Sequence, residues 1–293
     1  MAGILLVDKP PGITSHDVVA RARRARGTRK IGHAGTLDPM ATGLLVLGVD
    51  AATRLLTFVV GLDKTYEATI RLGETTTTDD ADGETTAVTD SSGVSADEIE
   101  THLSPLRGTI SQVPSTYSAI KVDGRRAYDL ARSGQEVQLA AREVTVTRLE
   151  VTDERRTGTV VDLDVTVDCS SGTYIRSLAR DLGVALGVGG HLTALRRTRI
   201  GPFHIGDAVG VEDLVEASPW PPAEAAAAVL GALGVTAAQA RDLRHGKRLA
   251  GIASALPGPR AAAIDPDGAL VGIVERRGDD IKSVVNMPEE VAG

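Results

Sequence analysis

Cysteine, aromatic residues and long hydrophobic runs are all scarce in this sequence of 293 residues. The single cysteine, Cys169, excludes an internal disulfide framework and a cysteine-rich metal site, which fits a reducing compartment. No hydrophobic run approaches the roughly 20 residues that a membrane-spanning helix needs. The first such run, Ile4 to Val7, is also too short for a secretory signal. We therefore expect a cytoplasmic protein with no membrane partner.

The sequence also lacks the motifs of common metal and cofactor sites. Phosphate-loop and dinucleotide-binding fingerprints are absent, and so is the nucleophile elbow of serine hydrolases. The histidines show no paired ligand spacing; they are His16, His33, His102, His191, His204 and His245. We therefore expect a site without metal or cofactor, built from carboxylate, guanidinium, imidazole and phenol groups.

The net charge of -7 is unevenly distributed along the chain. Eight acids and no lysine or arginine lie between Asp79 and Ser104, and we expect loops or exposed edge strands with solvated acids over residues 75–95. A basic stripe precedes them, with six cations in ten residues: Arg21, Arg23, Arg24, Arg26, Arg29 and Lys30. The basic stripe can follow the phosphates of a nucleic acid or be a solvated helix face. Charge alone leaves both interpretations open.

Hydrophobic patterning in the first part of the chain predicts alternating strands and helices. Residues 4–7 are typical of a short buried strand, and Thr14 or Ser15 can cap a helix that carries most of the basic stripe. An apolar strand is expected over 43–49 and a helix over 51–60. Asp38 lies in the loop between the basic stripe and the second strand.

Period-two alternation predicts half-buried strands over 66–72 and 161–169. After the second strand, the apolar residues from Ile175 onward follow helical spacing. Tyr174 and Arg176 therefore lie at a strand-to-helix junction, where side chains commonly point into a cleft.

The composition changes near the C-terminus. A proline-rich stretch at 218–222 and the alanine run after it are typical of a linker. Thr236 can then cap a helix, and Asp265 to Gly268 form a strong turn signal between two apolar strands. The last roughly 60 residues are predicted to form a small mixed domain.

Asp38 stands in the segment Gly-His-Ala-Gly-Thr-Leu-Asp-Pro, residues 32–39. Glycines allow close approach of a ligand, and a nucleophilic carboxylate must stay ionised near pH 7, for which a neighbouring arginine such as Arg176 is the usual means. A structural turn is the other interpretation, since Asp before Pro often forms one. His33 and the basic stripe favour a functional carboxylate.

Five segments, taken in order, resemble the successive motifs of the bacterial TruB family of tRNA pseudouridine-55 synthases. They are Gly3–Pro10, Gly32–Pro39 with Ala41–Gly43, Lys64–Tyr66, Gly172–Arg176 and Leu195–Arg197. The resemblance covers roughly residues 3 to 215, and the C-terminal part is similar to the PUA-like RNA-binding domain of many members.

The resemblance implies an α+β architecture: the pseudouridine synthase fold, with a central mixed, mainly antiparallel sheet, flanking helices and a small PUA-like domain. It implies a catalytic domain over 1–215 with a mobile RNA-closing insertion at about 122–142. A linker over 216–230 and the PUA-like domain over 231–293 follow.

The resemblance also implies that the protein converts the uridine at position 55 of the tRNA T-loop to pseudouridine, without cofactor or metal. Asp38 is then the catalytic nucleophile. The base must be flipped from the T-loop, at a cost on the order of a few kcal/mol, and stacking on a tyrosine can return about 1 to 3 kcal/mol. Whether Asp38 attacks C1′, attacks the ring or deprotonates the sugar stays open.

The other site residues are matched to the family position by position. Tyr66 is expected to stack on the uracil, Tyr174 and Leu195 to line its pocket, Arg176 to pair with Asp38, and His33 to help open the T-loop. Lys9, Asp80 and Lys121 are supporting candidates.

The expected partner is the T stem-loop of tRNA, bound by a monomer without guide RNA. Two alternatives remain: a non-catalytic protein of the same fold that binds or folds tRNA, and a guide-dependent pseudouridylase within a larger particle. Loss of turnover without loss of RNA binding in an Asp38→Asn variant would exclude the first, and activity of the protein alone would exclude the second.

Overall fold

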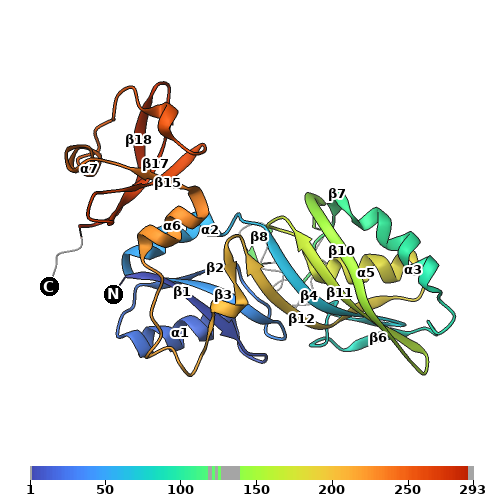
Figure 1. Ribbon diagram of the computed structural model, residues 1–293. Helices are drawn as coiled ribbons and strands as arrows, with labels where there is room; N and C mark the ends of the chain where they lie inside the picture. Colours follow the sequence, from blue (N-terminus) through green and yellow to red (C-terminus); the bar gives the residue numbers. More distant parts are fainter. Residues whose placement is uncertain (1, 118–120, 123–124, 127–138, 290–293) are drawn as a thin grey trace. The chain divides into compact units, whose positions relative to one another are not determined.

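The structure is a computed structural model that describes residues 2–117, 121–122, 125–126 and 139–289 (Figure 1). It divides into two compact units, which are described separately. Unit 1 comprises Met1–Asp38, Gly43–Val60 and Gly201–Gly293, and unit 2 comprises Pro39–Thr42 and Gly61–Ile200. Helices accompany mixed strands in unit 1 and antiparallel strands in unit 2, which confirms the predicted α+β class.

The first part of unit 1 is a small sheet with one long helix. Its elements are β1 (Gly3–Lys9), α1 (Ser15–Arg26), β2 (Ile31–Ala34), β3 (Thr42–Val49), η1 (Asp50–Leu55) and α2 (Leu56–Val59), joined later in the chain by β13 (Phe203–His204), η3 (Ile205–Asp207) and β14 (Val209–Gly210). Strand β1 pairs antiparallel with β3 and parallel with β14, and β2 pairs antiparallel with β3. The predicted helix over 51–60 is a 3-10 turn followed by one α-helical turn.

Helix α1 begins and ends where its sequence predicts. Thr14 caps it, and Asp17 completes a reciprocal capping box, which satisfies backbone N–H groups that the first turn leaves unpaired. Gly27 ends the helix in the left-handed conformation, with φ of 64°. The apolar side of α1, Val18 and Val19 among others, packs in a core with buried side chains of β1 and β3.

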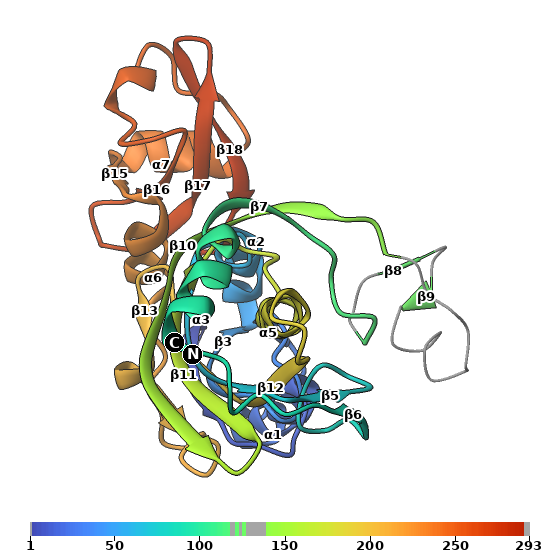
Figure 2. The same ribbon diagram turned by 90° about the vertical axis from the view of Figure 1, so that its right-hand side faces the viewer.

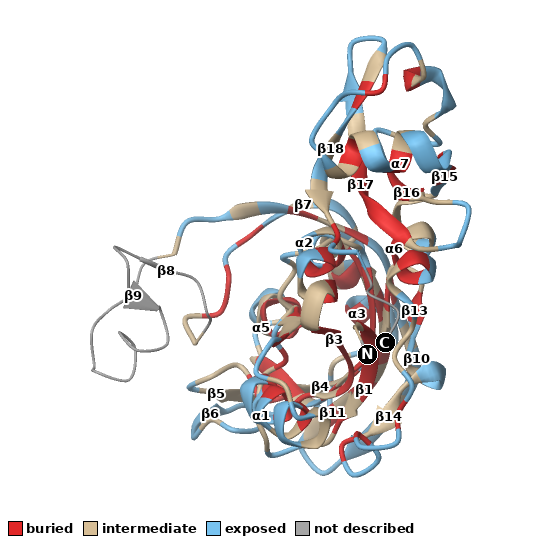
Figure 3. Cartoon of the chain, turned by 90° about the vertical axis from the view of Figure 1, so that its left-hand side faces the viewer, coloured by how far each residue is buried: buried red, intermediate tan, exposed pale blue. Residues whose placement is uncertain are grey.

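The C-terminal part of unit 1 is a second small sheet with its own core. Its elements are α6 (Pro222–Leu230), β15 (Ala232–Gly234), α7 (Ala237–Arg244), η4 (Ala253–Ala255), β16 (Arg260–Ile264), β17 (Leu270–Arg277) and β18 (Asp280–Asn286). The strands run in the order β15-β16-β17-β18, and the first pair is parallel. Thr236 caps α7 as predicted, and Figure 3 shows the buried residues concentrated on the strands and on one side of α7.

Part of the predicted linker over 216–230 is helical. The alanine run forms α6, which begins directly after Pro221 and buries Ala223, Ala225 and Ala226. Alanine has the highest helix propensity, and proline is well tolerated in a first helical turn. The domain boundaries expected from the family resemblance remain predictions, and most of the predicted insertion over 122–142 lies outside the described residues.

Unit 2 is built on an antiparallel sheet with strands in the order β12-β4-β11-β10-β7. Its elements are β4 (Lys64–Leu72), β5 (Glu74–Thr76), β6 (Thr85–Val88), α3 (Ala96–Leu103), η2 (Ser104–Leu106), β7 (Gly108–Gln112), β8 (Lys121–Val122), β9 (Arg125–Arg126), β10 (Arg142–Thr157), β11 (Val160–Cys169), α5 (Ile175–Ala185) and β12 (Gly190–Ile200). Helices α3 and α5 lie side by side within the curve of this sheet (Figure 2).

The alternating strands of unit 2 bury the residues that their pattern predicts. Every second residue of β4 and of β11 is buried, and polar residues occupy the positions between them. The segment 75–95 forms the β5–β6 hairpin and loops, as predicted. The prediction that its acids are solvated is wrong for Asp80, which is 3% exposed, because Arg176 of α5 pairs with it.

Candidate active site

Asp38 directly follows Leu37, whose backbone is hydrogen-bonded to Ser15, the first residue of helix α1. The hydroxyl of Ser15 donates to the carbonyl of Leu37 at 3.1 Å and accepts from its N–H at 2.9 Å. Leu37 and Ser15 are both buried, and Gly35 adopts a left-handed φ of 85°. The carboxylate of Asp38, at a partly exposed position, is therefore carried by an anchored backbone rather than by a loose loop.

Two other predicted residues lie in unit 1. Lys9, at the end of β1, is fully buried and donates to the carbonyls of Pro10 at 3.0 Å and Ile13 at 2.7 Å. Lys9 thus holds the turn that leads into α1. His33 lies on β2, and its ring contacts that of His16 edge to face, with centroids 5.4 Å apart.

The basic stripe divides between structural and exposed cations. Arg23 donates to the carbonyl of Ile31 at 2.8 Å, and Arg26 donates to that of Ala217 at 2.9 Å. Arg24, Arg29 and Lys30 are exposed. Arg23 and Arg26 thus help to hold the fold of unit 1, which neither interpretation of the stripe predicted, and contact of the exposed cations with phosphates stays a prediction.

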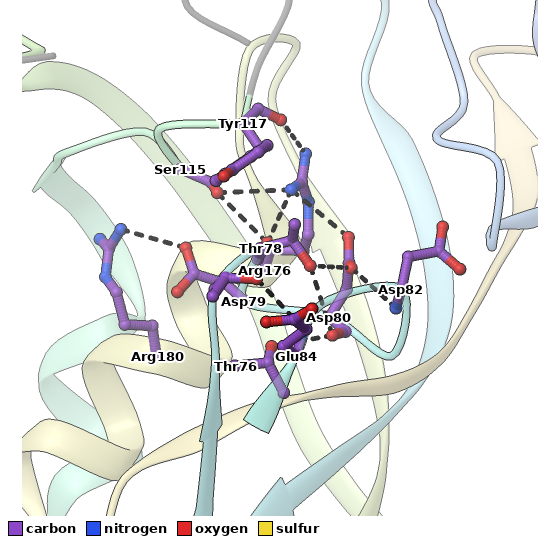
Figure 4. Close-up of polar contacts among 11 residues, drawn as sticks. Thr76, Thr78, Asp79, Asp80, Asp82, Glu84, Ser115, Tyr117, Arg176 and Arg180 are labelled. Atoms are coloured by element: carbon purple, nitrogen blue, oxygen red, sulfur yellow. Dashed lines mark hydrogen bonds and ion pairs between the residues drawn. The ribbon is translucent and has the colours of Figure 1, made fainter. Parts of the chain in front are cut away.

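In unit 2, Arg176 and Asp80 form a buried ion pair (Figure 4). Arg176 Nη1 lies 3.4 Å from Asp80 Oδ2, and each side chain is 4% exposed. Asp80 also accepts hydrogen bonds from the Thr78 hydroxyl and from the N–H of Asp82. A buried ion pair is tolerated only when such hydrogen bonds compensate for desolvation.

The guanidinium of Arg176 also holds the chain that follows β7. It donates to the carbonyls of Thr78 and Tyr117, both at 2.8 Å, and to the Ser115 hydroxyl at 3.3 Å. Arginine suits this role because its planar fork presents several donors at fixed angles. The predicted pairing of Arg176 with Asp38 concerns residues of different units and stays a prediction.

Tyr66 and Leu195 lie on neighbouring strands and are both buried, at 8% exposure each. Leu195 of β12 stands opposite Ala68, which shares a face of β4 with Tyr66, and Arg197 stands opposite Tyr66 itself. A groove of about 640 Å³ in unit 2 includes Leu195, Met40 and Thr42 in its lining, but most of the lining belongs to the polar face of the sheet, such as Glu67 and Thr166. Tyr66 does not line this groove.

Tyr174 lies at the N-terminus of α5, as the predicted strand-to-helix junction requires. The amide of Gln112 brackets its backbone: Nε2 donates to the Tyr174 carbonyl at 3.1 Å, and Oε1 accepts from its N–H at 2.9 Å. The guanidinium of Arg142 lies over the Tyr174 ring, 5.7 Å from its centroid, in a cation–π contact. Tyr174 is therefore fixed at the backbone and partly exposed at the ring.

Lys64 begins β4 and is 6% exposed, and its ammonium donates to the Leu62 carbonyl at 2.6 Å. Burial, helped by the nearby charge of Arg197, lowers the pKa of Lys64 from 10.5 to about 8. The folded state therefore releases this proton at a lower pH than the unfolded chain does. The buried charge therefore costs stability. This cost is fully present below pH 8 and disappears as the pH rises toward 10.5.

A Lys64→Met variant tests this charge burial. Below pH 8 the variant lacks the cost of the buried ammonium, whereas at higher pH the wild type loses that cost as well. We expect wild-type stability to rise relative to the variant by about 2 kcal/mol between pH 7.5 and pH 10. Urea unfolding of both proteins across this range measures the difference, and parallel stability curves would contradict it.

Several residues of these clusters could not be found from sequence patterns. Ser15, Gln112 and Ser115 act through contacts with residues far along the chain, and a serine or glutamine has no signal for that in its own segment. Arg197 did lie within a recognised motif. Lys121 begins β8, and its side chain is outside the described part of the structure.

Within the described ranges, no three side chains of the His, Cys, Asp or Glu types are grouped as a metal ion would require. None of the helices in that part of the chain is long and apolar enough to cross a membrane.

Comparison with known proteins covers almost the whole chain. Residues 23–175 match the TruB family pseudouridylate synthase N-terminal domain, residues 176–230 the tRNA pseudouridylate synthase B C-terminal domain, and residues 230–288 the tRNA pseudouridine synthase II C-terminal domain. Curated relatives named tRNA pseudouridine synthase B include one from Leifsonia xyli subsp. xyli, 54% identical over 99% of this chain and 98% of its own. Another, from Rhodococcus jostii, is 54% identical over 97% of this chain and 93% of its own.

Two solved structures share the fold over 98% of this chain. One is an H/ACA RNP bound to a substrate RNA containing 2′-deoxyuridine, with a TM-score of 0.71, 25% identity and 85% of its own chain covered. The other is a Cbf5-Nop10-Gar1 complex, with a TM-score of 0.70, 26% identity and 84% of its own chain covered. From the fold, the motifs and these matches, the chain belongs to the TruB family of pseudouridylate synthases.

Proposed function

We propose that this protein is a tRNA pseudouridine synthase that isomerises the uridine at position 55 of the T-loop. The observation that carries the proposal is the match, over nearly the whole length of both chains, to relatives named tRNA pseudouridine synthase B. The anchored Asp38 and the buried Arg176–Asp80 pair add to it, because an isomerisation without cofactor needs ionised groups on a rigid support.

The reaction leaves the atomic composition of the nucleotide unchanged. The N1–C1′ bond breaks, the uracil turns within its pocket, a C5–C1′ bond forms, the C5 proton leaves and N1 gains a proton. Asp38 is the catalytic carboxylate in this proposal. Attack at C1′, attack on the ring and proton removal from the sugar all require its ionised form.

The proposed pocket holds the base that leaves the T-loop stack. Tyr66 stacks on the flipped uracil, Leu195 and Tyr174 line its sides, and Arg176 supports Asp38. His33 assists the opening of the T-loop, and the exposed cations of the basic stripe contact phosphates. The burial of Tyr66 and Leu195 on neighbouring strands of one sheet supports this assignment.

In this proposal the protein acts as a cytoplasmic monomer and without guide RNA. The relatives named as tRNA enzymes are 54% identical, whereas the solved structures titled as RNP or multiprotein complexes are 25–26% identical. The catalytic domain spans 1–215, and the PUA-like domain over 231–293 adds RNA contacts. Helix α6 lies within the proposed connection over 216–230.

Release of the C5 hydrogen gives a direct assay of the proposed activity. A tRNA transcript made with uridine tritiated at C5 should release tritium to water when incubated with the protein, and the released amount should approach one equivalent per tRNA. A transcript with cytidine at position 55 is the matched control. Equal release from both transcripts would contradict the proposed position.

Tyr66→Ala tests the stacking role. Loss of the ring removes a base–aromatic contact worth about 1–3 kcal/mol, so the single-turnover rate should fall by ~5- to 150-fold. Tyr66→Phe keeps the ring and reports the contribution of the hydroxyl separately. An unchanged rate for Tyr66→Ala in a folded protein would show that the base does not stack on this residue.

A further inference from the structure

A second ion pair lies beside the Arg176–Asp80 pair (Figure 4). Arg180 Nη1 lies 3.6 Å from Asp79 Oδ2. Arg180 is one helical turn after Arg176 on α5, and Asp79 directly precedes Asp80 in the turn between β5 and β6. The two ion pairs therefore join the same helix to the same turn at two adjacent points.

Asp79 has a backbone conformation that needs support from its surroundings. Its φ is 60°, in the left-handed region, and among the described non-glycine residues it shares a positive φ only with Asp50. Aspartate tolerates this region better than most residues, but the conformation still has a cost and persists where neighbours enforce it. Such residues are concentrated at functional sites.

Contacts from two parts of unit 2 enforce the conformation of Asp79. Its carbonyl accepts from the N–H of Leu192 on β12 at 3.1 Å, and its carboxylate pairs with Arg180 of α5. Burial raises the pKa of Asp79, and the charges of Arg180 and Arg176 partly oppose this effect, whereas Asp80 adds to it.

The two arginines also hold the same segment after β7. Arg180 Nη2 donates to the carbonyl of Val113 at 2.8 Å, and Arg176 Nη2 donates to that of Tyr117 at 2.8 Å. Ser115, between them, accepts from Arg176 and donates to the carbonyl of Thr78, the residue before Asp79. A displacement of Asp79 is therefore transmitted through the backbone to Asp80 and to Thr78, whose carbonyl also accepts from Arg176.

We propose that Asp79 is a positioning residue for pseudouridine formation. Held by Arg180, its side chain keeps the turn in the left-handed conformation that directs Asp80 at Arg176. Asp79 acts through that ion pair. This inference rests on the proposed function, because its readout is the rate of that reaction.

Three substitutions separate the backbone requirement from the carboxylate. Asp79→Asn keeps tolerance of the left-handed region and the size of the side chain, but removes the charge. Asp79→Gly relieves the backbone and removes the side chain, and Asp79→Ala removes the side chain and disfavours the conformation. The expected order of single-turnover rates is wild type, then Asn, then Gly, then Ala.

The loss for Asp79→Ala should be ~5- to 150-fold, which corresponds to 1–3 kcal/mol of misplacement. The dissociation constant for tRNA should stay within about twofold of wild type in all three variants, because the change lies in positioning and not in RNA contacts. A purely structural role would instead lower the melting temperature and reduce rate and binding together, in proportion to the unfolded fraction.

Arg180→Ala tests the partner. It should reproduce part of the Asp79→Ala loss. The double variant should be no slower than Asp79→Ala alone, because the two residues act as one unit. Glu100→Gln, which breaks the exposed Glu100–Arg107 pair of the same unit, is the matched control and should keep the wild-type rate.

A wild-type rate for folded Asp79→Ala would overturn the proposal, as would fully additive losses in the double variant. Rate and tRNA affinity falling in parallel would overturn it as well. A wild-type protein that forms no pseudouridine would overturn the proposed function and this inference with it. That result is recognised at once, because it requires no substitution.

Discussion

An Asp38→Asn variant should bind tRNA like the wild type and form no measurable pseudouridine. The amide keeps the size and polarity of the carboxylate but cannot act as a nucleophile or base, so the single-turnover rate should fall by at least ~10³-fold. Leu37 stays fixed to Ser15 in the variant, since neither hydrogen bond involves the Asp38 side chain. Folding should therefore be unaffected.

The matched control is Asp97→Asn, the same chemical change at an exposed position on α3. It should keep both the rate and the dissociation constant. A binding protein without enzymatic activity would lose nothing in the Asp38→Asn variant, because it would form no pseudouridine before or after the change. A wild-type rate in that variant would require another residue to be the nucleophile.

Removing one partner of the buried ion pair has the second largest expected effect. In Asp80→Asn, Arg176 loses the carboxylate that balances its charge at 4% exposure. We expect the free energy of unfolding to fall by about 3 kcal/mol, measured by urea denaturation, together with a loss of activity of ~10-fold or more.

Arg176→Lys should not substitute for the arginine. A lysine ammonium is a point charge and cannot reach Asp80 together with the carbonyls of Thr78 and Tyr117 in the geometry of the guanidinium. Glu100→Gln, at an exposed ion pair, should unfold at the wild-type urea concentration. Unfolding of Asp80→Asn at that same concentration would contradict the importance of the buried pair.

Local patterns were sufficient to predict much of the fold. Period-two alternation predicted β4 and β11 because each strand has one buried and one polar face, and capping residues placed the starts of α1 and α7. The change in composition around the alanine run of α6 predicts a linker, but it does not show whether the chain there is extended or helical. Proline is compatible with a first helical turn, so the same residues begin a helix.

The candidate site was predictable only where residues carry motifs. Asp38, Tyr66 and Arg176 stood in recognisable segments, but the burial of Asp80 depends on a helix 96 residues further along the chain, and its own Thr- and Asp-rich segment indicated solvent exposure. The sequence presents Ser15 only as a candidate helix cap. Its bonds to Leu37 arise from tertiary packing, and Thr14 makes the cap instead.

The most direct measurement is position mapping of pseudouridine in an unmodified tRNA transcript incubated with the purified protein alone. Pseudouridine at position 55, and at no other uridine, is the predicted result, without guide RNA, metal or cofactor. An unmodified uridine 55 after incubation with folded, tRNA-binding protein would contradict the account.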